Sequence, residues 1–127
     1  MTGVNGAHFL IYSSQPDADR AFLRDVLGFR SVDAGPGWPI FALPPAELAV
    51  HPADGDDFVQ EHADHDMIGI VLYLMCEDVR AVVVSLEARS VKCKEVGTAP
   101  WGLHTVIRLP SGGHIGLYQP THPTAIG

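Results

Sequence analysis

The sequence predicts an α+β domain built from two copies of a strand–helix–three-strand unit. Three observations support this fold class. Apolar patterns follow the same order on both sides of an acidic segment, matching residues recur at a slowly growing offset, and each copy closes with a short strand that stops at proline: ELAVHP at 47–52 and HIGLYQP at 114–120. We place module one at 5–52, an acidic linker at 53–66 and module two at 67–120, within a single domain spanning 1–127.

Module one opens with a predicted strand and an amphipathic helix. AHFLIYSS alternates and is rich in aromatic and branched residues, which favours a strand. In QPDADRAFLRDVLGF, Pro16 marks the helix start and Gly28 its end. The apolar face is formed by residues at helical spacing, namely Ala18, Ala21, Phe22 and Val26. Three short strands are expected to follow in FRSVD, PIFAL and ELAVH, separated by GPG and PP turns.

Module two repeats this order. MIGIVLYLM predicts a strand, and acidic residues at the start of EDVRAVVVSLEARS favour the N-terminal end of a helix. Its apolar face is predicted at Val79, Val82, Val83 and Leu86. SVKCKEV, LHTVIRL and HIGLYQP then predict three strands, separated by TAPWG and PSGG.

The offset between the copies grows in small steps at the turns. Asp17 matches Asp78 at 61 positions, Trp38 matches Trp101 at 63, and Ala49 matches Gly116 at 67. Insertions are tolerated in turns, so this growth is what a duplication predicts. The alternative is that any α+β domain yields two rough copies when they are looked for.

Composition and charge restrict the classes of function. The chain has 127 residues, of which 46% are hydrophobic, and this suits one compact domain. The net charge of −7 and the lack of a basic cluster argue against nucleic acid as a partner. No apolar run reaches the ~20 residues of a membrane span, and the start lacks a signal-peptide pattern. With Cys76 and Cys93 expected as reduced thiols, we predict a cytoplasmic protein with no membrane partner.

Two segments then carry a resemblance to a known family. AHFLIYSSQPDADRAFLRDVLGFRSV leads from a strand through a helix to the phrase DVLGF, and PWGLHTVIRLPSGGHIGLYQP closes the chain. Together with the repeat, these segments resemble the vicinal oxygen chelate superfamily, which includes glyoxalases, bleomycin-resistance proteins and extradiol dioxygenases. The resemblance implies two tandem βαβββ modules, a curved mixed sheet around a cleft, and a homodimer.

In metal-using members of that superfamily, four inward side chains on the first and last strands of each module hold a divalent metal. His8 matches the first of these positions. The other three fall on Ala49, Val71 and Gly116, none of which has a donor atom. A single imidazole does not hold a divalent ion against water, so we assign no metal ligand set and no confident cofactor, although a divalent metal is kept as an alternative. The catalytic residues are left unassigned.

The alternative metal site is shifted along the strands. Glu47 and His114 lie two positions before the expected sites on the same face, and His51 lies two after. A site of His8, Glu47 or His51, and His114 would need the metal to move by ~6.6 Å along the strand. In the linker, His62, Asp64, His65 and Asp66 could also chelate a metal, but a solvated acidic loop is the favoured interpretation.

Aromatic side chains supply the other candidate contacts. Each tyrosine could contact a ligand or serve as a core residue. Trp38 and Trp101 could cover a ligand from opposite sides, or each could cap its own module; His104 is interpreted as an ordinary strand histidine. The candidate ligand-binding residues are His8, Tyr12, His51, Tyr73, Trp101, His114 and Tyr118.

These observations leave two main hypotheses. The first is a protein of this superfamily with a degenerate metal site that binds a small aromatic or apolar molecule, neutral or cationic, in its cleft. The second is a metal-dependent lyase, isomerase or dioxygenase that uses a shifted site around His8. A structural or regulatory role is a third, weaker option.

Overall fold

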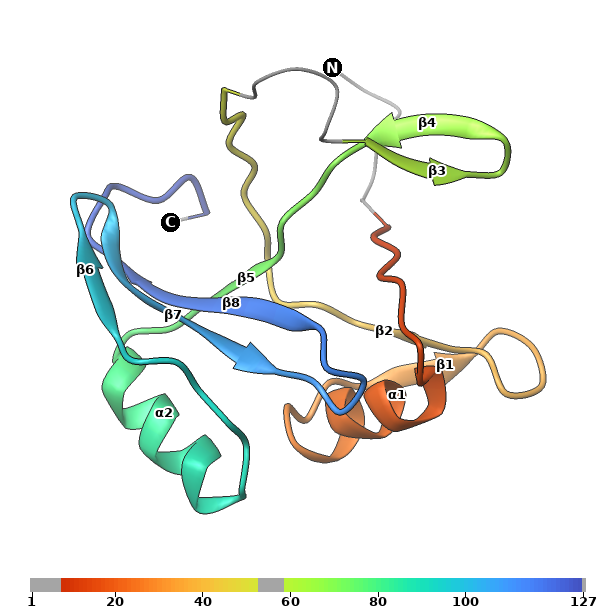
Figure 1. The fold of residues 1–127 in the computed structure, drawn as a ribbon, viewed down its shortest axis with the longest axis horizontal. Helices are drawn as coiled ribbons and strands as arrows, with labels where there is room; N and C mark the ends of the chain where they lie inside the picture. The colour runs from red at the N-terminus through yellow and green to blue at the C-terminus, as the bar shows by residue number, and fades with distance from the viewer. Residues whose placement is uncertain (1–7, 53–58, 127) are drawn as a thin grey trace.

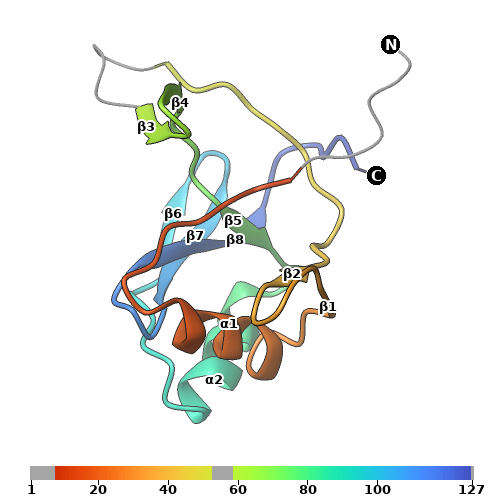
Figure 2. The ribbon, with the colours of Figure 1, turned by 90° about the vertical axis from the view of Figure 1, so that its right-hand side faces the viewer.

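The computed structural model describes residues 8–52 and 59–126 of the chain (Figure 1). The described part is an α+β fold in which both helices lie on the same side of a four-stranded sheet (Figure 2). In chain order, its elements are α1 (Pro16–Asp25), β1 (Ser31–Asp33), β2 (Pro39–Phe41), β3 (Val59–His62), β4 (His65–Ile68), β5 (Tyr73–Met75), α2 (Val79–Ala88), β6 (Gly97–Ala99), β7 (Gly102–Arg108) and β8 (His114–Pro120). No described helix is long and apolar enough to cross a membrane.

Both helices form where the sequence predicts them. Pro16 opens α1, and Phe22 is its buried apolar residue. Asp78 caps the start of α2 by accepting a hydrogen bond from the backbone N–H of Ala81 at 3.1 Å, because the first N–H groups of a helix have no partner within it. The predicted apolar face of α2 is confirmed, since Val79 and Leu86 are buried and the two valines between them pack against the core.

The main sheet has the order β5-β8-β7-β6. β5 runs parallel to β8, and the other pairs are antiparallel, so the second half of the chain is a complete strand–helix–three-strand unit. The prediction of HIGLYQP as the closing strand is confirmed by β8. In the β7–β8 pair, His104 lies opposite Tyr118, Val106 opposite Gly116, and Arg108 opposite His114.

The hydrophobic core lies between the helices and one face of this sheet. Its buried apolar side chains are Phe22, Val79, Leu86, Val91, Ile107, Leu109, Ile115 and Leu117. Successive residues of a strand face opposite sides, so burial of Ile115 and Leu117 places Gly116 and Tyr118 on the side away from the helices. We call this second side the open face of the sheet.

The first half of the chain differs from the prediction at both ends. Residues 8–14 and 46–52 are not in strands, although a strand was predicted in each. β1 and β2 do pair as a hairpin, but that hairpin forms a sheet of its own. The two outer segments have the composition of strands and meet no sheet edge within the described chain to complete their backbone hydrogen bonds.

The acidic segment also differs from the prediction. We expected a linker without strands, yet part of it forms the β3–β4 hairpin, which stands apart from the main sheet (Figure 1). Ala63 and Asp64 both take positive φ, 52° and 63°, which is the backbone geometry of a tight hairpin turn. Every residue of the two strands is exposed, so the acidic side chains remain in water.

Two strands of module two are shorter than predicted. MIGIVLYLM is divided between β4 and β5, and this leaves Val71 exposed and outside any strand. SVKCKEV contributes one isolated bridge, between Cys93 and Ile107, while β6 forms further along, partly in a segment that we predicted as a turn. Residues 93–99 therefore pair with β7 in two separate places, at Cys93 and again from Gly97. The pairing is interrupted because the register against β7 shifts by one residue between the Cys93–Ile107 bridge and the Gly97–His104 pair.

One buried polar contact joins the two halves and was not predicted. Asp19 of α1 is only 3% exposed, and its carboxylate accepts two hydrogen bonds from Ser111 in the β7–β8 turn. The backbone N–H of Ser111 donates at 3.0 Å and its hydroxyl at 2.7 Å. A buried carboxylate is tolerated because it is hydrogen-bonded, so this pair fixes α1 against the β7–β8 turn.

We expect Asp19→Asn to lower the free energy of unfolding by about 1–2 kcal/mol, because the neutral amide replaces two charge-assisted hydrogen bonds with weaker ones. Urea denaturation followed by circular dichroism measures the change. Asp17→Asn on the same helix is the control, since the Asp17 side chain is 98% exposed. Equal stability of the two variants would show that the Asp19 contact does not join the halves.

Candidate ligand-binding site

Aromatic rings from several elements meet on the open face. Trp101, in the turn between β6 and β7, stacks on the His104 ring with centroids 4.7 Å apart. Its indole also meets the Tyr118 ring edge-on at 5.5 Å and the Tyr73 ring at 5.9 Å. Tyr73 and Tyr118 contact each other at 5.4 Å, and His122 lies beyond Tyr118 at 6.0 Å. We call these five residues the aromatic cluster.

Two glycines make room for these rings. A Cβ on Gly116 would overlap the Tyr73 ring, so the ring rests directly on the backbone of β8. A Cβ on Gly97 would lie 3.1 Å from the His104 ring, closer than most such contacts. The glycines therefore leave space beside the backbone for the rings of Tyr73 and His104.

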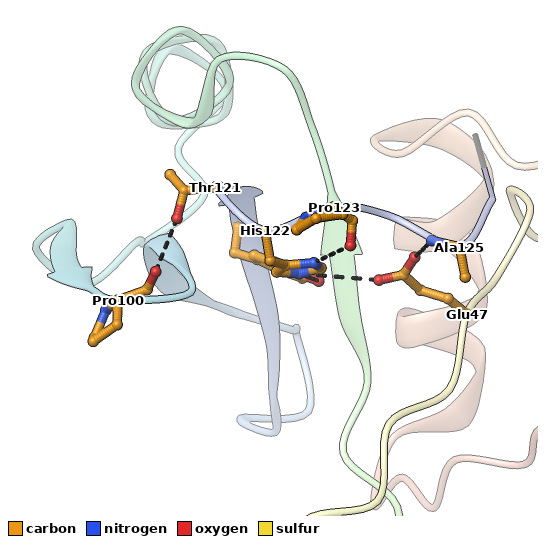
Figure 3. A network of polar contacts seen from close by, with 7 residues as sticks. Glu47, Pro100, Thr121, His122, Pro123 and Ala125 are labelled. Atoms are coloured by element: carbon orange, nitrogen blue, oxygen red, sulfur yellow. Dashed lines mark hydrogen bonds and ion pairs between the residues drawn. The ribbon is translucent and has the colours of Figure 1, made fainter.

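A polar network extends from one end of the cluster to the first half of the chain (Figure 3). His122 donates from Nδ1 to the carbonyl of Pro123 at 2.8 Å, so in the neutral imidazole Nε2 is the acceptor. The Tyr118 hydroxyl then donates to Nε2 at 3.2 Å. Glu47 lies 4.0 Å from the same Nε2 and accepts a hydrogen bond from the N–H of Ala125 at 2.8 Å.

The phenol of Tyr118 stays protonated at neutral pH. Burial raises its pKa above the ordinary value, and the negative charge of Glu47 raises it further. Tyr118 can therefore act as a hydrogen-bond donor to His122 or to a bound molecule. Glu47 gives this end of the site a negative charge.

The structure brings together three of the predicted ligand-binding residues, Tyr73, Trp101 and Tyr118. The others lie elsewhere. His8 and His51 are exposed, with His51 bonded to the carbonyl of Pro52, and the Tyr12 hydroxyl contacts His62 Nδ1. His114 lies at the far end of the open face, opposite Arg108.

Two members of the cluster were missed by the sequence analysis. His104 was interpreted as an ordinary strand histidine, and His122 was not considered. His104 could have been found by pairing the predicted strands LHTVIRL and HIGLYQP, because their register places His104 directly opposite Tyr118. His122 follows the end of β8, and only the turn of the chain there brings it back beside Tyr118.

Three of the positions that hold the metal in metal-using members of the vicinal oxygen chelate superfamily carry no metal-binding side chain in this protein. Ala49 and Val71 are exposed, and the Tyr73 ring occupies the space that a side chain at Gly116 would need. Among the residues that the structure describes, no three His, Cys, Asp or Glu side chains are grouped so that they could hold a metal ion. We therefore derive no chemical step through a metal.

Trp38 does not share the position of Trp101. Its ring lies 4.9 Å from the guanidinium of Arg20 on α1, and it is 53% exposed. The two tryptophans match in the sequence repeat, but only Trp101 belongs to the aromatic cluster.

The chain was compared with known proteins by sequence and by structure, and only the structures match. No sequence model of a protein family matches the chain, and no curated protein matches it. Among solved structures, TnmS3, an antibiotic binding protein from Streptomyces sp. CB03234, is 22% identical with a TM-score of 0.64; the match covers 95% of this chain and 99% of that chain.

Two further structures show the same likeness. Lactoylglutathione lyase from Agrobacterium tumefaciens is 21% identical with a TM-score of 0.62, over 94% of this chain and 96% of the other. A member of the glyoxalase/bleomycin resistance protein/dioxygenase superfamily from Sphaerobacter thermophilus is also 21% identical, with a TM-score of 0.58 over 91% and 98%. The chain thus has the α+β fold of the glyoxalase/bleomycin resistance/dioxygenase superfamily, as its sequence predicts.

Proposed function

We propose that this protein binds a small aromatic or apolar molecule on the open face, against the aromatic cluster. The observation that carries the proposal is the cluster itself: its rings are held in mutual contact, yet Trp101 is 40% exposed and Tyr73 is 37% exposed. Rings held by one another lose little conformational freedom when a ligand stacks on them. Small-molecule sites typically combine such aromatic walls with a few placed polar groups.

The polar network supports orientation of the ligand. Tyr118 and His122 present hydrogen-bonding groups beside the rings, and Glu47 adds a negative charge that favours a neutral or cationic group at this end. TnmS3, which is described as an antibiotic binding protein, shares the fold, and this likeness supports binding rather than a particular ligand.

Fluorescence of a single tryptophan tests the proposal. The chain has two tryptophans, so Trp38→Phe leaves Trp101 as the only one. We expect titration with the neutral aromatic probe 1-pyrenebutanol to quench Trp101 emission saturably by energy transfer to pyrene. In Trp101→Phe the remaining Trp38 is the matched control, and we expect weaker quenching there. Quenching that does not saturate in either variant would contradict the proposal.

We also propose that the protein forms a homodimer through the extended segments 44–52 and 69–72. These segments are outside strands in the described chain, and they expose large apolar side chains: Leu48 is 86% exposed, Val50 91% and Val71 78%. Exposed apolar side chains of this size are a feature that a second copy of the chain can cover. Most soluble oligomers form such self-complementary interfaces.

We expect the wild-type protein to elute as a dimer and Leu48→Glu/Val50→Glu to elute as a monomer, because two carboxylates on each copy would be desolvated in the interface. Size-exclusion chromatography with light scattering at micromolar concentration measures the mass. Val84→Glu, on the exposed side of α2 at 68% exposure, is the control. A wild-type monomer would remove the dimer from the proposal.

A further inference from the structure

The open face continues from the aromatic cluster to a groove at its other end. This groove encloses about 400 Å³, and its lining includes Lys92, Lys94, Arg108 and His114 but no Asp or Glu. It thus gathers both lysines of the chain and one arginine, out of eight Lys and Arg residues in a protein of net charge −7. We call it the basic groove.

Strand pairing places these side chains on the open face. Cys93 pairs with Ile107, whose side chain is fully buried in the core, so the residues on either side of Cys93 point the other way. The N–H of Arg108 donates to the carbonyl of Lys92 and that of Lys94 to the carbonyl of Val106, both at 3.0 Å. Lys92 therefore lies beside Arg108, and across the β7–β8 pair Arg108 lies opposite His114.

The cations of the basic groove lack the carboxylate partners that two arginines of α1 have. Arg20 and Arg24 of α1 pair with carboxylates at 3.0 Å and 2.8 Å. Within residues 8–52 and 59–126, no carboxylate lies within ion-pair distance of Lys92, Lys94 or Arg108. Like charges gathered without a counter-charge raise the local affinity for an anion, even on an acidic protein.

Gly112 adds to the shape of the groove. It takes a positive φ of 96° in the turn after β7, and a Cβ there would lie 3.5 Å from a terminal nitrogen of Arg108. Glycine at this position therefore places no side chain against the guanidinium. A guanidinium presents paired N–H donors that match a carboxylate or a phosphate.

The spacing along β7 relates the basic groove to the aromatic cluster. His104 and Arg108 share the open face and are four residues apart, which corresponds to about 13 Å at the usual rise of a strand. Between them, Val106 and Gly116 form an apolar stretch. The face therefore changes from aromatic through apolar to cationic along one direction.

We infer that the basic groove binds the acidic group, a carboxylate or a phosphate, of an elongated ligand whose ring lies on the aromatic cluster. This inference rests on the proposed function and specifies its ligand class as an aromatic acid with a flexible spacer. The protein as a whole is negatively charged, but the acidic group of the ligand would lie next to the cations of the basic groove. Those nearby charges attract it more strongly than the distant, screened carboxylates repel it.

Matched probes test the inference. We expect 1-pyrenebutyrate or 1-pyrenebutyl phosphate to bind about tenfold more tightly than the neutral 1-pyrenebutanol, which is the effect of about one charge-assisted contact. The tighter of the two acids identifies the group. Arg108→Gln and Lys94→Gln are expected to reduce the affinity for the acids to that for the alcohol, without changing the binding of the alcohol.

Arg80→Gln removes the same charge from the exposed side of α2, which lies on the helix side of the sheet and not on the open face, and serves as the control. If all three probes bind equally, or if Arg80→Gln removes the preference as fully as Arg108→Gln, the inference is wrong and the proposed function stands. If none of the probes affects Trp101 emission, the proposed function itself fails, and the inference fails with it.

Discussion

Trp101→Ala is expected to weaken the binding of 1-pyrenebutanol by about 2 kcal/mol, or roughly thirtyfold. Trp101 contacts Tyr73, His104 and Tyr118, so its removal takes away its own stacking surface and also loosens the neighbouring rings. Aromatic pairs of this kind contribute ~0.5–1.5 kcal/mol each beyond the area they bury.

Trp38→Ala is the matched control, because it removes the same side chain from a position beside Arg20 and outside the aromatic cluster. Isothermal titration calorimetry measures both affinities independently of tryptophan emission. Unfolding of each variant by urea shows whether the fold is retained. Equal loss of affinity in Trp38→Ala, or none in Trp101→Ala, would place the ligand elsewhere.

Gly116→Val is expected to destabilise the protein by about 3 kcal/mol, because the new side chain must displace the Tyr73 ring from the backbone of β8. Valine is otherwise favoured over glycine in strands, so we attribute the expected loss to the ring, whose atoms are the nearest to a Cβ at Gly116. In a Tyr73→Ala background the ring is absent, so Gly116→Val is expected to leave the free energy of unfolding unchanged or to increase it.

A double-mutant cycle of Gly116→Val and Tyr73→Ala, followed by urea denaturation, measures this coupling. A coupling free energy of about 3 kcal/mol is expected if the ring occupies the space over Gly116. Equal destabilisation of both backgrounds by Gly116→Val would show that the glycine is required for another reason. The ring would then not be what excludes a metal ligand from that position.

The helices and the closing strand could be predicted because local pattern determines them. The apolar spacing of Val79 to Leu86 describes a helix face whatever it packs against, and the alternation of HIGLYQP describes a strand with one buried side. The two-copy pattern also predicted the class of fold. These features depend on residues that are close together in the sequence.

The outer segments of module one could not be predicted in the same way. AHFLIYSS and ELAVH have strand composition, but a strand forms only where another strand supplies hydrogen-bond partners, and none does so in the described chain. The β3–β4 hairpin was missed for the opposite reason. Its turn geometry at Ala63 and Asp64 outweighed an acidic composition that is typical of a loop.

The candidate site was predicted in part. Strand parity indicated that Tyr73 and Tyr118 could point to one face, and the repeat drew attention to Trp101. The contacts that make these rings a cluster depend on register between β5, β7 and β8, which brings distant residues together. The link between Asp19 and Ser111, 92 positions apart, is likewise visible only in the folded chain.

Intermolecular nuclear Overhauser effects between 1-pyrenebutanol and the protein test the central claim most directly. We expect cross-peaks from the pyrene protons to the rings of Trp101, Tyr73 and Tyr118, because the ligand is proposed to lie against the aromatic cluster. Cross-peaks confined to Leu27, Leu74 and Leu117, which line an apolar space on the helix side of the sheet, would contradict the account.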